Sequence, residues 1–196
     1  MTQPDLLAAL EPVVSVLEEL GVEYSVVGSV ASSAYGIARS TVDADIVANL
    51  PAVRVDALVA RLEQDYYVDR DAARDATRRR SMFNVIHLAT MIKVDVYVLG
   101  NREFDRGSFA RRVTRTLIDT KGARTYQLDT AEDTVLHKLE WYRAGGDVSD
   151  RQWGDIVGVL TIQGDALDRA YLDHWANVLD VVELLARAWR DATRSA

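Results

Sequence analysis

The chain has 196 residues, of which 48% are hydrophobic and 27% are charged, which is typical of one globular domain or of a domain with a helical extension. Its formal net charge of −7 excludes a surface that attracts nucleic acid over its whole area, so any contact with nucleic acid has to be local. The absence of cysteine excludes disulfide bonds, thiolate metal sites and cysteine nucleophiles.

The N-terminal segment MTQPDLLAALEPVVSVLEEL is amphipathic and acidic. A secretory signal would instead begin with basic residues and continue with an apolar run. No apolar stretch of the sequence reaches the length needed to span a membrane. We therefore expect a soluble cytoplasmic protein with no membrane partner.

Up to residue 128 the sequence alternates between helical and strand patterns. Strands are predicted over 22–28, 42–49, 66–69 (an edge strand), 82–89 and 92–99, and a hairpin over 115–128 turns around Lys121 and Gly122. Helices are predicted over 5–20, 29–36, 51–64 and 102–112, and residues 70–80 form either a polar helix or a loop.

From Asp129 onward only helical patterns remain. Thr130 and Asp133 have the spacing of a capping box that opens the first of these helices. The shift predicts a catalytic α/β domain over 1–128 and a helical domain over 129–196. The fold class expected is α/β (α+β), a mixed β-sheet flanked by helices with a C-terminal helical bundle.

Two carboxylates interrupt the apolar pattern of the strand predicted over 42–49. Thr41, Asp43 and Asp45 alternate with apolar residues, so all three oxygen-bearing side chains face one side of the strand. Side chains at i and i+2 lie about 6.5 to 7 Å apart, and two charges at that distance repel by about 2.5 kcal/mol at an effective dielectric of 20. A divalent cation would compensate for this repulsion.

The strand predicted over 92–99 repeats the alternation, with Lys93, Asp95 and Tyr97 on one face. If this strand neighbours the first, Asp95 converges with Asp43 and Asp45. Three carboxylates without histidine or cysteine favour a hard cation, Mg²⁺ or Mn²⁺. Such sites commonly hold two ions that clamp a nucleoside triphosphate.

Gly28 and Ser29 stand where a predicted strand meets a predicted helix. A helix that begins there presents backbone N–H groups and a hydroxyl to a phosphate, and glycine permits close approach. The simpler interpretation of Ser29 is a helix cap, and the two roles are compatible.

The Gly28-Ser29 pair, the Asp43-x-Asp45 strand and the later Asp95 resemble the DNA polymerase β-like nucleotidyltransferase superfamily. The run GSVASSAYGIARSTVDADIV is similar to minimal bacterial nucleotidyltransferases, including the AbiEii/AbiGii-type toxin branch. Three later segments resemble further motifs of that branch: IKVDV around Asp95, EDTVLHKLEWY with Lys138, and RQWGDIVGVL with Arg151 and Asp155. The spacing Lys93-x-Asp95 departs from the lysine-x-x-aspartate of the branch.

This resemblance implies metal-dependent transfer of a nucleoside monophosphate from an NTP to an acceptor, with release of pyrophosphate. Asp43 and Asp45 would hold both ions, and Asp95 would bind one ion or act as general base. Ser29 would bind the triphosphate beside Gly28 and Thr41, and Lys138 would neutralise its developing charge. Asp155 would also contribute to nucleotide binding. The acceptor would be a tRNA, a protein or a small molecule, and an antitoxin-type protein partner is implied.

Simpler interpretations stand beside several of these assignments. Lys138 lies beside the apolar stripe of its predicted helix, which suits a lysine reaching into a site and also an ordinary snorkelling lysine; we favour the functional interpretation. Asp155 lies off the stripe of its own helix, so a solvated aspartate is an equal alternative. The basic run from Arg70 to Arg80 is interspersed with Asp71 and Asp75, and we interpret it as a solvated helix.

Two other functional classes remain open. One is a binding module that keeps the fold but senses a nucleotide or a partner without turnover, as in a toxin–antitoxin pair. The other is a phosphohydrolase that uses the same acids. Three mutually repelling carboxylates favour the nucleotidyltransferase over the binding module, because an active site that no longer catalyses a reaction has no physical need to retain them.

Overall fold

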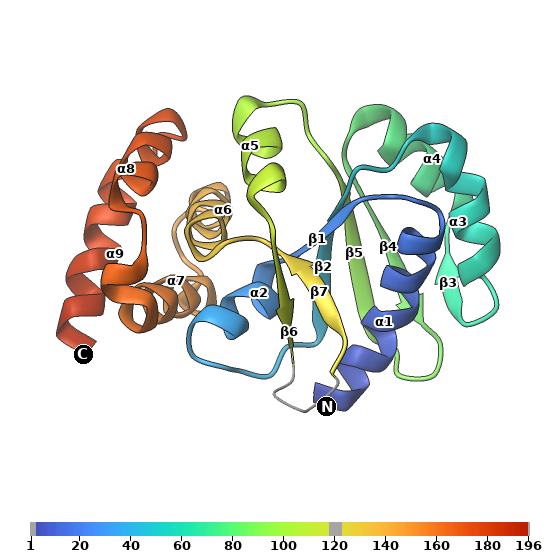
Figure 1. The fold of residues 1–196 in the computed structure, drawn as a ribbon, viewed down its shortest axis with the longest axis horizontal. Coiled ribbons are helices and arrows are strands. Elements are labelled where there is room, and N and C mark those ends of the chain that lie inside the picture. Colours follow the sequence, from blue (N-terminus) through green and yellow to red (C-terminus); the bar gives the residue numbers. More distant parts are fainter. Residues whose placement is uncertain (1–2, 118–122, 196) are drawn as a thin grey trace. The chain divides into compact units, whose positions relative to one another are not determined.

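A computed structural model describes residues 3–117 and 123–195 of the chain. Figure 1 shows helices interspersed with strands up to β7, with helices following in the described part beyond it. The strands are β1 (Tyr24–Val27), β2 (Asp43–Ala48), β3 (Tyr66–Val68), β4 (Met82–His87), β5 (Lys93–Val98), β6 (Val113–Thr116) and β7 (Thr125–Leu128). The helices are α1 (Gln3–Glu19), α2 (Gly28–Tyr35), η1 (Ala52–Arg54), α3 (Val55–Leu62), α4 (Arg70–Arg79), α5 (Glu103–Arg111), α6 (Ala131–Ala144), α7 (Asp150–Gln163), η2 (Gly164–Ala166), α8 (Arg169–Val178) and α9 (Val182–Ser195), where η marks 3-10 helices.

The described strands form one seven-stranded sheet in the order β3-β4-β5-β2-β1-β7-β6. The sheet is mixed, because β2 runs parallel to β5 and β1 parallel to β7, while the other neighbouring pairs are antiparallel. β3 lies at one edge, as predicted for residues 66–69. β2 and β5 are direct neighbours, so paired residues of the two strands face the same side of the sheet.

One face of the sheet carries a hydrophobic core. Helices α1, α3 and α4 pack on that face, as Figure 1 shows. The side chains that β2 and β5 bury there are Ala44, Ile46, Ala48, Val94, Val96 and Val98. Because side chains alternate along a strand, the polar residues of both strands occupy the opposite face.

By packing, the chain forms two compact units. The first consists of Met1–Val27 and Ser40–Leu128 and contains the sheet. The second consists of Gly28–Arg39 and Asp129–Ala196, so that α2 groups with the C-terminal helices. Close packing explains this grouping, since a Cβ atom added at Gly36 would lie 2.8 Å from the backbone nitrogen of Val159 in α7.

The mixed sheet and the helical C-terminal part confirm the predicted fold class. The helix predicted over 51–64 begins as the 3-10 helix η1 and becomes α-helical at Val55. The predicted hairpin is present as the antiparallel pair β6–β7, and its turn at Lys121 and Gly122 lies outside the described residues. Within 3–117 and 123–195, no helix has both the length and the apolar character needed to cross a membrane.

The basic run after β3 is a helix, α4, rather than a loop. Asp69 caps its N-terminus by accepting hydrogen bonds from two backbone N–H groups of the first turn. Arg74 pairs with Asp71, and Arg78 with Asp75, both at i, i+3, which confirms the interpretation as a solvated, internally paired helix.

Candidate active site

The predicted acidic side chains of β2 and β5 lie on one face of the sheet. Asp45 is the register partner of Asp95, and Asp43 is the register partner of Lys93. Neighbouring strands are about 4.8 Å apart, so each pair stands side by side across the two strands. The adjacency on which the convergence of the three carboxylates depended is therefore present.

Asp95 is the most deeply buried of the three carboxylates, with 5% of its surface exposed. One of its oxygens, Oδ2, lies 2.7 Å from the ammonium nitrogen of Lys93. Its other oxygen, Oδ1, is buried and has no hydrogen-bond partner in the described part of the chain. An orphaned buried carboxylate oxygen is costly, and a ligand that satisfies it would remove that cost.

The neighbours of these carboxylates respond to their charge. The hydrogen bond to Asp95 raises the pKa of Lys93, against the opposing effect of burial, and the charges of Asp43 and Asp45 raise it further. Burial, helped by the same carboxylates, raises the pKa of Tyr97 to about 12, so its hydroxyl stays protonated. The carboxylate charges contribute to both shifts in the direction expected for nearby negative groups.

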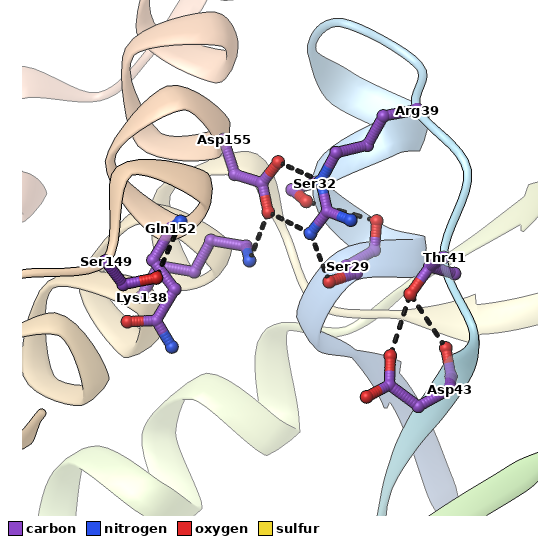
Figure 2. Close-up of polar contacts among 9 residues, drawn as sticks. All are labelled: Ser29, Ser32, Arg39, Thr41, Asp43, Lys138, Ser149, Gln152 and Asp155. Atoms are coloured by element: carbon purple, nitrogen blue, oxygen red, sulfur yellow. Dashed lines mark hydrogen bonds and ion pairs between the residues drawn. The ribbon is translucent and has the colours of Figure 1, made fainter.

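Thr41 precedes β2 and donates a hydrogen bond of 2.7 Å to Oδ1 of Asp43 (Figure 2). Asp43 is thus oriented by its neighbour two residues before it. The sequence assigned Thr41 to nucleotide binding. In the structure its hydroxyl contacts the carboxylate of Asp43 and can position it, while the nucleotide-binding role of Thr41 stays a prediction.

The donor set of this acidic cluster fits a hard cation. All three predicted ligands are carboxylates, and one of them carries the orphaned oxygen. Within the described ranges, however, no three His, Cys, Asp or Glu side chains stand together as a group that could hold a metal ion. Two of the three carboxylates instead contact neighbouring side chains, Asp95 with Lys93 and Asp43 with Thr41.

The predicted phosphate-binding turn begins where β1 ends. Val27 is the register partner of Asp45, and Gly28 follows it as the first residue of α2. Gly28 has φ of +64°, a left-handed conformation that glycine adopts without steric cost. This conformation allows the chain to pass directly from strand to helix. As in every α-helix, the first N–H groups of α2 have no partner within the helix.

Ser29 belongs to a polar network of the second unit, shown in Figure 2. Arg39 donates from Nη2 to the Ser29 hydroxyl at 2.6 Å. The same guanidinium donates hydrogen bonds to both oxygens of Asp155, from Nε at 2.6 Å and from Nη2 at 2.7 Å. Lys138 donates to Oδ2 of Asp155 at 2.7 Å. Asp155 therefore holds two cations, one of which contacts Ser29.

This network is more deeply buried than the sequence indicated. Lys138 is 2% exposed and Asp155 8% exposed, so neither the surface lysine nor the solvated aspartate is present. Burial would raise the pKa of the Asp155 carboxyl, but the hydrogen bonds from Arg39 and Lys138 outweigh it and lower the pKa below its usual value. A buried lysine needs such a counter-charge.

Arg39 is the member that the sequence did not single out. It lies in the segment between α2 and β2, where no periodicity marks which side chains turn inward. The only signal was a cation ten residues after Ser29. Its two partners lie 10 and 116 positions away in the chain, so tertiary packing alone brings the three together.

Local capping fixes the two helices that carry Lys138 and Asp155. Thr130 caps α6 by accepting from the Asp133 N–H, which is one of the two hydrogen bonds of the predicted capping box, and its hydroxyl also donates to the Asp133 carboxylate. Ser149 caps α7 by accepting from the backbone of Gln152 (Figure 2). These caps set the first turn of each helix.

No family model and no curated protein sequence matches the chain. Among solved structures, the chain is similar to the lincosamide antibiotic adenylyltransferase LnuA bound to lincomycin, with a TM-score of 0.51 and 16% identity over 83% of this chain and 98% of that one. It is also similar to the antibiotic-resistance factor ANT(2'')-Ia, with a TM-score of 0.52 and 14% identity over 96% and 93%. A third similar structure is an antigenic nucleotidyltransferase-like protein from Paracoccidioides brasiliensis, with a TM-score of 0.57 and 15% identity over 97% and 94%. The chain has a nucleotidyltransferase fold.

The nucleotidyltransferase fold agrees with the superfamily that the sequence resembles. At 14 to 16% sequence identity, these structures show a likeness in fold alone. The resemblance to the AbiEii/AbiGii-type branch stays a prediction. Of the predicted site residues, Asp43, Asp45 and Asp95 lie on one face of the sheet unit, on the neighbouring strands β2 and β5. In the helical unit it brings together Ser29, Lys138 and Asp155.

Proposed function

We propose that the chain is a metal-dependent nucleotidyltransferase that moves a nucleoside monophosphate from an NTP to an acceptor and releases pyrophosphate. The register of β2 and β5 supports this most directly, since it sets Asp45 opposite Asp95 on the polar face of the sheet. The shared nucleotidyltransferase fold supports it independently.

Asp43, Asp45 and Asp95 are the proposed metal ligands. Mg²⁺ or Mn²⁺ bound by them would neutralise phosphate charge and lower the pKa of an attacking hydroxyl. Without the metal ion, Thr41 keeps Asp43 in a defined orientation, and Lys93 balances part of the negative charge of the three carboxylates.

The triphosphate is assigned to Gly28, Ser29 and Lys138. The N–H groups at the start of α2 and the Ser29 hydroxyl are donors for phosphate oxygens. The Lys138 ammonium has three donor hydrogens, and Asp155 accepts one of them. Asp155 acts on the nucleotide through Arg39 and Lys138, by holding both cations in place.

In the proposed reaction the acceptor hydroxyl attacks the α-phosphorus of the NTP. A new oxygen–phosphorus bond forms as the bond from the α-phosphorus to the bridging oxygen breaks, and pyrophosphate leaves. Asp95 takes the proton of the attacking hydroxyl, and its buried, unpartnered Oδ1 is available for it. Lys138 and Arg39 stabilise the charge that grows on the departing pyrophosphate.

Three acceptor classes are consistent with the proposal: a tRNA, a protein and a small molecule. The names of LnuA and ANT(2'')-Ia, an antibiotic adenylyltransferase and an antibiotic-resistance factor, favour a small molecule. The toxin-like resemblance favours a tRNA or protein acceptor and an antitoxin-type partner. The formal net charge of −7 disfavours a large RNA footprint.

A binding module without turnover is the second candidate. One observation favours it: the described residues contain no group of carboxylates already arranged to hold a metal ion. Calorimetry with an NTP and Mg²⁺ separates the candidates. Metal-dependent NTP binding without pyrophosphate release over a long incubation would identify the module.

The test of the proposal is transfer of label from NTPs radiolabelled at the α-phosphate. The wild type is incubated with each NTP, Mg²⁺ and cell extract, and the products are separated into RNA, protein and small molecules. We expect label in one of these fractions and pyrophosphate in solution. Asp43→Ala and Asp45→Ala should each reduce transfer about 100-fold or more, because each removes charge that the transition state requires.

Asp173→Ala is the matched control, since Asp173 is an exposed carboxylate on α8. It should transfer label at the wild-type rate. Label recovered only as free nucleoside monophosphate would identify a phosphohydrolase. Equal transfer by wild type and Asp43→Ala would exclude the proposed role of the acidic cluster.

A further inference from the structure

Lys93 is a cation among the carboxylates on the polar face of the sheet. It is the register partner of Asp43 and lies two residues before Asp95, so it shares the polar face of the sheet with all three carboxylates. Its ammonium nitrogen lies 2.7 Å from Oδ2 of Asp95, and the charges of Asp43 and Asp45 also act on it. The positive charge of Lys93 therefore stands within the field of the whole acidic cluster.

A second observation concerns Asp95. Lys93 satisfies one oxygen of this carboxylate, while the other, Oδ1, is buried without a partner. The side chain of Asp95 is 7% exposed and that of Lys93 is 41% exposed. A surface ion pair between two mobile side chains would leave both partners hydrated, whereas here the acid stays buried and only the cation reaches solvent.

These observations fit the lack of a preformed metal group in the described residues. A carboxylate oxygen that accepts a hydrogen bond from an ammonium cannot at the same time direct that lone pair at a metal ion. Release of Lys93 from Asp95 would free Oδ2, and the lysine has a flexible stem and a partly exposed head that permit the movement.

We propose that Lys93 is an internal counter-ion that takes the place of the metal between the carboxylates and has to leave Asp95 when the metal binds. This inference rests on the proposed function, because it assumes that the acidic cluster is a metal site. Lys93 then weakens the binding of free metal ions. It is a positioning residue, since it acts through Asp95.

Binding of Mn²⁺ alone, followed by electron paramagnetic resonance of the free ion, tests the inference without any need for turnover. Lys93→Met removes the charge and keeps the apolar stem. It should bind Mn²⁺ about tenfold more tightly than the wild type, which corresponds to about 1.4 kcal/mol. Lys93→Arg keeps the charge and should restore binding to near the wild-type value.

Arg54→Met is the matched charge control, because Arg54 is exposed on η1, beyond the opposite end of β2 from Asp43. It should change Mn²⁺ affinity less than twofold. Lys93→Gln, with circular dichroism of every variant, provides a second charge-removing variant should Lys93→Met fold poorly. Equal or weaker Mn²⁺ binding by both charge-removing variants would overturn the inference.

The outcomes also separate the inference from the function on which it rests. Wild-type binding that is lost in Asp43→Ala, with no gain in Lys93→Met, would overturn the inference and leave the metal site standing. Absence of Mn²⁺ binding in the wild type and in all Lys93 variants would overturn the metal site together with the inference.

Discussion

Asp155 uses both of its carboxylate oxygens to hold cations, and this makes it a central residue of the helical unit. Arg39 donates to both oxygens and Lys138 to one of them. Lys138 is almost completely buried, so its charge depends on this carboxylate for compensation. Removing one partner of such a pair leaves the other charge buried and unpaired.

We therefore predict that Asp155→Ala lowers the free energy of unfolding by about 3 kcal/mol at pH 7, the usual cost of breaking a buried ion pair. The pKa of Asp155 is lowered in the folded state, so its contribution is present above the unfolded pKa and is lost as the pH falls through the folded value. The difference from wild type should narrow in acid. Urea unfolding at several pH values measures both effects.

Asp173→Ala serves as the control, since Asp173 is an exposed carboxylate of α8 in the same unit. Its free energy of unfolding should stay within about 0.5 kcal/mol of the wild type. A loss for Asp155→Ala no larger than this control would show that the network contributes nothing to stability.

Helix α6 carries two charged side chains that pair with aspartates of the helical unit, Lys138 and His137. One side carries Lys138, while His137 pairs with Asp129 just before the helix, at 2.8 Å between Nδ1 and Oδ2. The His137 ring also stacks on Trp141 with 6.0 Å between centroids. Burial opposes the charged imidazole, but the hydrogen bond that His137 donates to Asp129 and the negative charge of Asp129 outweigh burial and raise the pKa of His137.

This element gives a pH prediction. A raised pKa in the folded state means that the contribution of His137 is fully present below the unfolded pKa and is lost as the pH rises through the folded value. His137→Gln should reduce the free energy of unfolding by about 1.5 kcal/mol at pH 6, the size of a hydrogen bond between charged groups, and by less at pH 9. Urea unfolding at the two pH values measures the change.

His174→Gln on α8 is the matched control, because His174 is an exposed histidine of the same unit. It should follow the wild-type pH dependence. If His137→Gln lost as much stability at pH 9 as at pH 6, the protonated imidazole would not be the stabilising form.

At the scale of the whole molecule, the two units each carry one of the proposed ligand clusters. The sheet unit contains the carboxylates and the helical unit contains the cations around Ser29. The chain links them covalently, since Gly28 follows Val27, the register partner of Asp45. A ligand bound only by the native state should stabilise the folded chain by mass action.

We predict that ATP with Mg²⁺, at about one hundred times its dissociation constant, raises the free energy of unfolding by about 2.7 kcal/mol. Replacement of Mg²⁺ by EDTA should remove the metal-dependent part of this gain. The double variant Asp43→Ala, Asp45→Ala should lack that part in either condition. Urea unfolding measures these free energies. An equal metal-dependent gain in the free energy of unfolding of the double variant would place the metal elsewhere.

The local pattern of helices and strands follows from the amino-acid sequence. A period of two places Asp43 with Asp45, and Lys93 with Asp95, on one face of a strand whatever the neighbours are. A period of 3.6, with Thr130 as a cap, likewise defined α6. These features depend on residues within a few positions of one another, which is why they can be predicted without a fold.

Which of these faces meet depends on how the whole chain packs. The strand order β3-β4-β5-β2-β1-β7-β6, the pairing of Asp45 with Asp95 and the packing of α2 with the C-terminal helices all depend on segments far apart in the chain. Arg39 and Asp155 pair although they are 116 positions apart in the chain. They pair because α6 and α7 bury Lys138 and Asp155 together. Burial is a property of the packed chain, and periodicity along one segment does not contain it.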